Sequence, residues 1–309
     1  MDKTKRGIAL FITLLIIASI LSIVAVSFSY LEKVQKDASV VSAIIQGDIL
    51  YKDTTEILKR IFPKGKVNGK KLNMIYTLPL MINEPESGLN INLKCDPLLK
   101  GVPIKWLDEK FTKKIPQRLE LAKKVLSSIL EKFDIKEPNR LEELILSNIT
   151  GKNIEDREYI PRLDMAKNIV SKEQFYNILL NYRLKYDDES VFRVPWDRYF
   201  VFVDVTQKAL IDGAYITPEL ISMAFDIPIE SVKDDWVEVS SSIDEDKITL
   251  KKFLIQNDIE ESFDAKLFSE KGLNAMHCEE RFAYRENFYS FSFDYSNERS
   301  LNFEFNGEI

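Results

Sequence analysis

The sequence has little of the chemistry on which enzymes and metal centres rely. Its 309 residues include one histidine, His277, and two cysteines, Cys95 and Cys278. A single histidine beside one cysteine and two glutamates supplies too few ligands for a zinc site, and no second histidine is present to support thiol catalysis. Serine-hydrolase, zinc-protease and phosphate-loop motifs are also missing from the sequence. We therefore expect no enzyme, and we expect His277 to be an ordinary loop residue.

Charge is missing from a long stretch near the N-terminus. No charged residue occurs in the 23 residues from Ile8 to Tyr30. A helix of that length, rising about 1.5 Å per residue, matches a hydrocarbon core of about 30 Å. The stretch is too long for the core of a signal peptide, and no small-residue cleavage site follows it. One interpretation is a plain single-pass anchor, with Lys3, Lys5 and Arg6 holding the N-terminus in the cytoplasm and the body outside.

The residues around Gly7 favour a more specific interpretation. The run KRGIALFITLL, residues 5–15, resembles the processing site of type IV pilins and type II secretion pseudopilins, in which a basic leader ends in glycine. The resemblance implies that prepilin peptidase cuts between Gly7 and Ile8 and that Ile8 is then methylated. Most members carry glutamate at the fifth mature position, where this sequence has Ile12. The minor pseudopilin K family of type II secretion (general secretion pathway protein K, GspK) lacks that glutamate, so the departure points to this family.

The resemblance implies a function, partners and a location. A family member of this kind stands at the tip of the type II secretion pseudopilus and initiates and caps filament assembly for protein export across the outer membrane. The implied partners are minor pseudopilins I and J, other inner-membrane components of type II secretion, and prepilin peptidase, with the chain in the bacterial inner membrane. Small residues allow close helix packing there, so the expected packing residues are Ile12, Ala18, Ser19, Ser22 and Ala25. A minor pilin of a type IV pilus or DNA-uptake system, or an unrelated membrane-anchored periplasmic binding domain, are the alternatives.

The chain as a whole predicts an α+β, pilin-like fold: a long N-terminal transmembrane spine helix on a small antiparallel sheet, with a large, mainly α-helical insertion. The expected segments are a cleaved leader (1–7), the spine helix (8–62), the first part of the sheet (63–105), the inserted domain (106–280) and an aromatic hairpin that completes the sheet (281–309). Apolar residues recur every three or four positions in the second half of the helix, and we expect this stripe to pack on the body. Its members are Leu31, Val34, Ala38, Val41, Ile45, Ile49, Ile57, Leu58 and Ile61. Gly47 is a candidate kink.

Shorter patterns predict the elements that follow. Asn68-Gly69 suits a hairpin turn, with a strand over 72–82. Periodicity predicts helices over 116–133, 140–149, within 165–186 and over 248–267, and a β-rich stretch over 191–205. Thr217 is a predicted N-cap with Pro218 at the first helical position. Aromatic residues alternate with small polar ones over 289–295 and again over 301–305, which predicts a hairpin with one aromatic face.

Charge and the remaining reactive residues limit the ligands. The net charge is −6, and the chain beyond the basic leader carries −8, which argues against nucleic acid as the main partner. Pseudopilin K of some systems binds calcium in its insertion, so the resemblance makes Asp187, Asp188 and Glu189 candidate Ca²⁺ ligands, although no EF-hand loop is present. No other cofactor is expected. In an oxidising periplasm Cys95 and Cys278 could form a disulfide; two separate buried thiols are the alternative.

Overall fold

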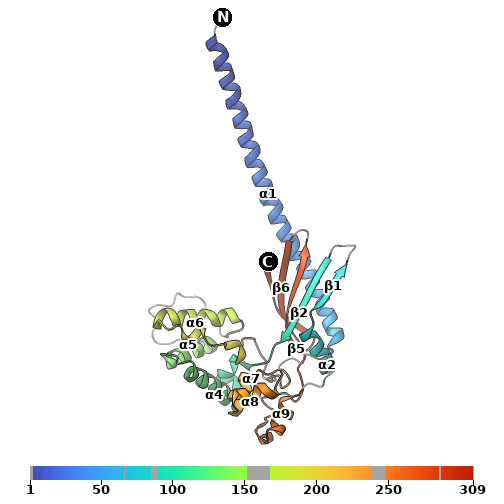
Figure 1. Ribbon diagram of the computed structural model, residues 1–309, viewed down its shortest axis with the longest axis vertical. Helices are drawn as coiled ribbons and strands as arrows, with labels where there is room; N and C mark the ends of the chain where they lie inside the picture. The colour runs from blue at the N-terminus through green and yellow to red at the C-terminus, as the bar shows by residue number, and fades with distance from the viewer. Residues whose placement is uncertain are drawn as a thin grey trace.

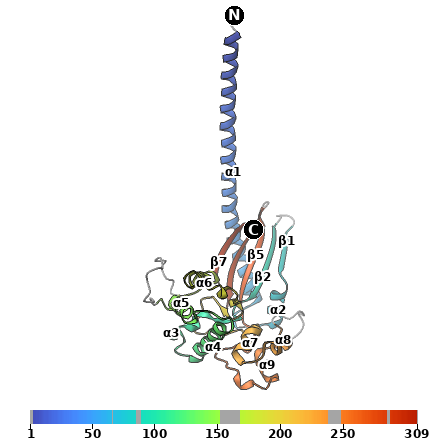
Figure 2. The same cartoon turned by 60° about the vertical axis from the view of Figure 1, so that its left-hand side comes forward.

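The chain folds into a long rod and a body at one end of it. The computed structural model describes residues 3–65, 67–84, 89–151, 168–237, 248–284 and 287–308. The rod is a single helix, α1 (Lys3–Ile61), with the N-terminus at its far end (Figure 1). The body joins a sheet, which lies along the second half of α1, to a group of short helices beside it (Figure 2). The α+β fold predicted from the sequence is confirmed.

The sheet is antiparallel, with strand order β1-β2-β5-β6-β7. Its strands are β1 (Leu80–Glu84), β2 (Leu89–Pro97), β5 (Ala275–Tyr284), β6 (Asn287–Ser296) and β7 (Arg299–Glu308). The predicted aromatic face is present, because Tyr289, Phe291, Phe293 and Tyr295 of β6 are all buried. Tyr51 of α1 packs edge-on against Phe293, with ring centroids 5.3 Å apart. The sheet therefore covers one side of α1.

The segment after α1 differs from its prediction. Instead of a hairpin at Asn68 and a strand over 72–82, the chain forms α2 (Gly69–Thr77) before β1 begins at Leu80. The Asn68 side chain accepts a hydrogen bond of 3.1 Å from the Lys71 N–H and caps the helix. Asparagine favours both turns and helix N-caps, so the local pattern did not distinguish the two.

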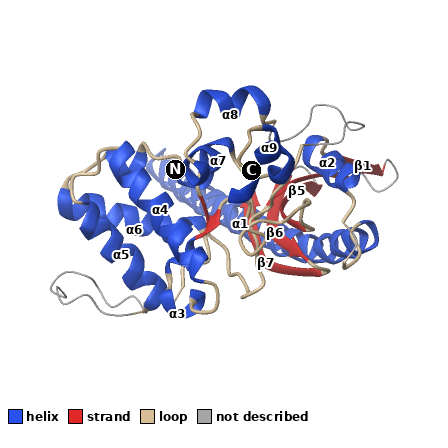
Figure 3. Cartoon of the chain, turned by 90° about the horizontal axis from the view of Figure 1, so that it is seen from below, coloured by secondary structure: helices blue, strands red, loops and turns tan. Residues whose placement is uncertain are grey.

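The insertion between β2 and β5 is mainly helical. It contains, in order, β3 (Val102–Pro103), η1 (Ile104–Leu107), α3 (Glu109–Thr112), α4 (Pro116–Lys132), α5 (Pro138–Thr150), α6 (Lys172–Tyr186), η2 (Ser190–Phe192), η3 (Trp196–Arg198), β4 (Phe200–Val201), α7 (Pro218–Phe225), α8 (Ile229–Asp235), α9 (Leu250–Gln256) and η4 (Glu260–Ser262). Helices α3 to α6 lie on the opposite side of the body from α2 and β1 (Figure 3). The insertion has a hydrophobic core of its own, centred on buried aromatic residues such as Trp106, Phe175 and Trp196.

Several predictions for the later part of the chain were wrong. The helix predicted over 248–267 is shorter, because α9 ends at Gln256 and only the 3-10 turn η4 follows it. The stretch 191–205 contains two 3-10 turns, and only Phe200 and Val201 form a strand. Their parallel partner strand consists of Val102 and Pro103 alone, so the strand stays short. The sheet strand β5 begins at Ala275, six residues before the predicted start of the C-terminal hairpin segment at 281. His277 therefore lies in a strand and not in a loop.

Candidate assembly surface

Helix α1 presents one face to the sheet. Ala43, Leu50, Thr54 and Leu58 are buried there, and they follow the spacing of a single helix face. A Cβ atom on Gly47 would lie 3.2 Å from the Phe305 ring of β7. Glycine at position 47 therefore lets the sheet approach α1 closely. The helix continues through Gly47 without a break. The face of α1 that contains Ala43 and Gly47 is therefore the one that meets the aromatic rings of the sheet.

The opposite face of α1 carries the apolar stripe that the sequence analysis expected to be buried, and that expectation was wrong. Val34, Val41, Ile45 and Ile49 are 46–58% exposed, and only Leu58 among the later members is buried. Both faces of the helix are apolar, so periodicity alone did not show which one meets the sheet. In the single chain a row of branched aliphatic side chains faces solvent beyond the apolar N-terminal half.

The N-terminal half of α1 projects away from the body (Figure 1), and its described side chains, those of residues 11 and 13–30, are all exposed. Of the predicted packing residues, Ala18, Ser19, Ser22 and Ala25 are all exposed. The hydroxyls of Ser19 and Ser22 donate to the carbonyls of Leu15 and Ala18, at 2.8 and 2.9 Å, so they add no unpaired donor to an apolar surface. Gly7, Ile8 and Ile12 lie within the helix, and their side chains are outside the described part of the structure. Among the described residues, α1 is the one helix long and apolar enough to cross a membrane.

The structure joins Cys95 and Cys278 in a disulfide. They stand opposite each other in the β2–β5 ladder, and both are fully buried on the side of the sheet that faces α1. Because β2 precedes the insertion and β5 follows it, the bond closes the loop that contains the whole insertion.

The candidate calcium ligands have other roles. Asp188 is buried and accepts hydrogen bonds from the Ser190 N–H and hydroxyl (2.9 and 2.6 Å) and from the Lys136 N–H (2.9 Å). Glu189 forms an ion pair of 2.5 Å with Arg183, and Asp187 ends α6 in a left-handed backbone conformation. No cluster of three or more metal-ligating side chains occurs in the described ranges. These residues do not fit a calcium ion, and we assign none to them.

His277 faces away from α1 on the outer side of the sheet. Its Nδ1 lies 2.8 Å from Asp294 on β6, directly across the ladder. This hydrogen bond raises the pKa of the half-exposed imidazole, against the lowering effect of its burial. The contact is a cross-strand pair within the sheet.

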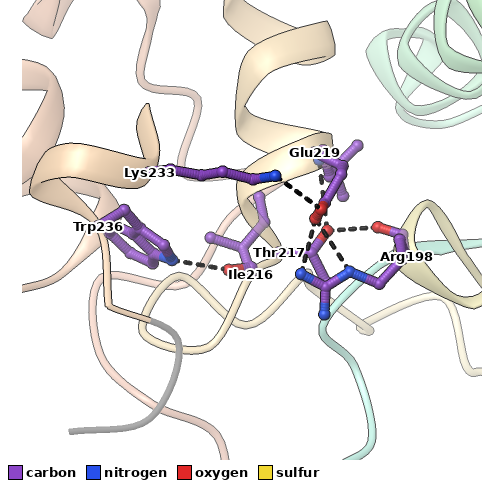
Figure 4. A network of polar contacts seen from close by, with 7 residues as sticks. Arg198, Ile216, Thr217, Glu219, Lys233 and Trp236 are labelled. Carbon is purple, nitrogen blue, oxygen red and sulfur yellow. Dashed lines mark hydrogen bonds and ion pairs between the residues drawn. The ribbon is translucent and has the colours of Figure 1, made fainter. Parts of the chain in front are cut away.

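A polar network holds the helices of the insertion to one another (Figure 4). Thr217 caps α7 by accepting from the Leu220 N–H at 3.3 Å, and its hydroxyl donates to the Arg198 carbonyl. Glu219 accepts from the Arg198 guanidinium at 2.7 Å, and Lys233 of α8 approaches the same carboxylate. The predicted cap at Thr217 and Pro218 is confirmed.

Asp212 fixes the insertion to the sheet. Its carboxylate accepts from the N–H groups of Ala214 and Leu273, each at 2.9 Å, and its own N–H donates to the Leu99 carbonyl at 2.8 Å. Leu99 follows β2 and Leu273 precedes β5, so this one residue joins the entry of the insertion through its backbone and the exit through its side chain. Gly213 passes so close to Ser269 that an added Cβ would lie 2.0 Å from its carbonyl oxygen.

Comparisons with known proteins place this fold. No protein-family model matches the chain, and no curated protein matches it. A chain in the crystal structure of the GspK-GspI-GspJ complex from the type 2 secretion system of enterotoxigenic Escherichia coli has a similar fold, with a TM-score of 0.54 and 9% sequence identity. The match covers 85% of this chain and 97% of that chain. At that identity the similarity shows the fold, which is the one that the resemblance of residues 5–15 led us to expect.

Proposed function

We propose that the protein is a minor pseudopilin of a type II secretion system and that it stands at the tip of the pseudopilus. The observation that carries this proposal is the apolar stripe of α1, Val34, Val41, Ile45 and Ile49, which lies outside the anchor and faces solvent. Burying apolar surface is worth about 25 cal/mol per Å². A continuous row of this kind therefore marks a surface that another molecule covers.

Parallel helices of sister subunits fit this stripe. The anchor half of α1 offers Ala18, Ser22 and Ala25 on one side for close helix packing in lipid. Beyond the membrane the stripe offers a second contact surface, on the other side of the helix. Subunits anchored by the same kind of helix, with N-terminus in the cytoplasm and body in the periplasm, present their helices in the same direction. Minor pseudopilins I and J are the proposed partners, because the structure with the similar fold is a complex of GspK with GspI and GspJ.

The position at the tip rests on Ile12 and on the insertion. In related filaments a glutamate at the fifth mature position pairs with the amine of the subunit ahead, and a subunit with nothing ahead can do without it. The insertion adds bulk beside the sheet at the end of the molecule farthest from the anchor (Figure 1). A minor pilin of a type IV pilus shares the leader and remains the second candidate. A binding domain that joins no filament would leave the stripe of α1 uncovered.

Co-purification from membranes tests the helix contact. The double variant Ile45→Glu and Ile49→Glu places two charges on the stripe, and we expect it to lose subunits I and J of its own system. Lys36→Glu is the matched control, because it changes the net charge by the same two units at an exposed position on the opposite side of α1. Retention of both subunits by the double variant at wild-type levels would contradict the proposed contact.

Processing tests the leader. Incubation with prepilin peptidase and a methyl donor should remove residues 1–7 and leave N-methylated Ile8 as the new N-terminus. A Gly7→Leu variant should stay full length. Wild-type protein that keeps Met1 in cells with an active peptidase would instead favour an unprocessed membrane anchor.

A further inference from the structure

Glu280 is a carboxyl group enclosed between α1 and the sheet. It is 0% exposed and lies on the face of β5 that meets α1. Across the ladders its neighbours are Leu93 of β2 and Phe291 of β6, which are apolar. Thr54 of α1 donates a hydrogen bond of 2.7 Å to Oε2. Its other oxygen, Oε1, has no hydrogen-bond partner in the part of the chain that the structure describes.

The described residues around Glu280 offer no positive charge to balance an ionised carboxylate. No described lysine or arginine forms an ion pair with it, and Arg281, the next residue, pairs with Glu279 on the outer face of the sheet. The charged group that acts on it from α1 is Asp53, which is also an anion. Burial raises the pKa of Glu280 to about 7; the Thr54 hydrogen bond opposes this shift, and Asp53 adds to it.

We propose that protonation of Glu280 controls the contact between α1 and the sheet. The neutral carboxyl keeps the Thr54 hydrogen bond and carries no net charge into the apolar surroundings of Leu93 and Phe291. The ionised form is a buried charge without a counter-ion, and such a charge is costly unless the structure opens to let water reach it. Ionisation therefore loosens α1 around Thr54.

The loosening is confined to the middle of the interface. The neighbouring polar contact joins the Tyr51 hydroxyl of α1 to Ser300 of β7 at 2.6 Å, one turn of helix from Thr54. Farther along, Leu58 is fully buried and the Tyr295 hydroxyl donates to the Phe62 carbonyl at 3.2 Å. These outer contacts hold the end of α1 while the part around Thr54 opens. Because the contact lies within one chain, the proposal stands independently of filament assembly.

The sign of the pH effect follows from the raised pKa. A glutamate in the unfolded or opened state has a pKa near 4.5. The closed state holds the proton more tightly, so its advantage is complete below that value and is lost as pH rises through about 7. The contact between α1 and the sheet should thus weaken as the pH rises from mildly acidic to mildly alkaline. At still higher pH it should change little, because Glu280 is then fully ionised.

The test uses full-length protein in detergent micelles. Carbon-13 NMR of glutamate-labelled protein, with the Glu280 signal assigned from the Glu280→Gln spectrum, should show a midpoint near 7. Hydrogen-exchange protection of α1 amides around Thr54, corrected for intrinsic exchange, should fall several-fold from pH 5.5 to pH 8. In Glu280→Gln the protection should not depend on pH. Glu279→Gln, on the outer face of the same strand, should behave as wild type.

A second variant keeps the test decisive if Glu280→Gln does not fold. Thr54→Val removes the hydrogen bond that favours the ionised form and should move the Glu280 midpoint to higher pH. The proposal is overturned if Glu280 titrates near 4.5, if the wild-type protection stays constant while Glu280 titrates, or if Glu280→Gln keeps the wild-type pH dependence.

Discussion

Removing the Cys95–Cys278 disulfide should lower the unfolding free energy of the body, because the bond closes a long loop of the chain. The two cysteines face each other in the β2–β5 ladder, with a sequence separation of 183. Every helix of the insertion lies within this loop. Without the bond, the unfolded chain gains the freedom to separate the two ends of the loop, and folding must bring β2 and β5 together again.

The length of the loop sets the size of the effect. In the loop-closure model a cross-link over about 180 residues restricts the unfolded chain by about 5 kcal/mol at 25 °C, and removal of native disulfides costs about 2–5 kcal/mol in practice. The double variant Cys95→Ala and Cys278→Ala should therefore lose about 2–5 kcal/mol of unfolding free energy. Both positions are fully buried, so the missing sulfur atoms contribute part of the loss.

Urea unfolding of the full-length protein in detergent, followed by tryptophan fluorescence, measures this loss. Trp106, Trp196 and Trp236, the three tryptophans of the chain, all lie in the insertion, so the signal reports the enclosed loop and is not affected by α1 in the micelle. Wild-type protein kept reduced is the control, because it lacks the cross-link but keeps both sulfur atoms. An unfolding free energy for reduced wild type within about 0.5 kcal/mol of the oxidised protein, well below the expected loss, would refute the loop argument.

Three further predictions test the packing and the polar contacts. Gly47→Leu places a side chain where a Cβ already meets the Phe305 ring at 3.2 Å, and it should cost about 1–3 kcal/mol in urea unfolding, whereas Gly69→Ala, with nothing within 4 Å, should change little. Asp188→Asn weakens a buried acceptor of several N–H and O–H groups and should cost about 1–3 kcal/mol, with added Ca²⁺ leaving the melting temperature of wild type and variant unchanged. A calcium-dependent rise in the wild type alone would contradict the role given to Asp188. The pKa of His277 is raised by Asp294, so their contact stabilises the sheet below pH about 6.5 and this contribution disappears as pH rises past the folded pKa. His277→Gln should remove that part of the pH dependence of thermal unfolding, and an unaltered profile would show that the pair does not contribute.

Helix α1 has two apolar faces with different kinds of side chain. The face toward the sheet includes two small residues, Ala43 and Gly47, where aromatic rings can approach the helix closely. The face away from the sheet consists of branched aliphatic residues such as Ile45 and Ile49. A helix that is apolar on both faces is typical of an element packed on two sides. Here the body supplies one side, and the proposed sister helices supply the other.

The sequence by itself determined the features that depend on neighbours along the chain. The charge-free run from Ile8 to Tyr30 and the apolar periodicity beyond it predicted α1, the alternation of residues 289–295 predicted β6, and Thr217 with Pro218 predicted the start of α7. Each signal is local, because helix caps, proline and side-chain alternation act within a few residues.

Only the tertiary structure decided which surfaces meet. It placed Gly47 against Phe305, joined Cys95 to Cys278, added β5 to the sheet and enclosed Glu280 beside Thr54. It also turned the apolar stripe of α1 outward and made Asn68 a helix cap. These outcomes depend on partners up to about 250 residues away in the chain, such as Ser300 for Tyr51. Periodicity shows that a face is apolar, but the shape of the distant strand decides whether that face is the one buried.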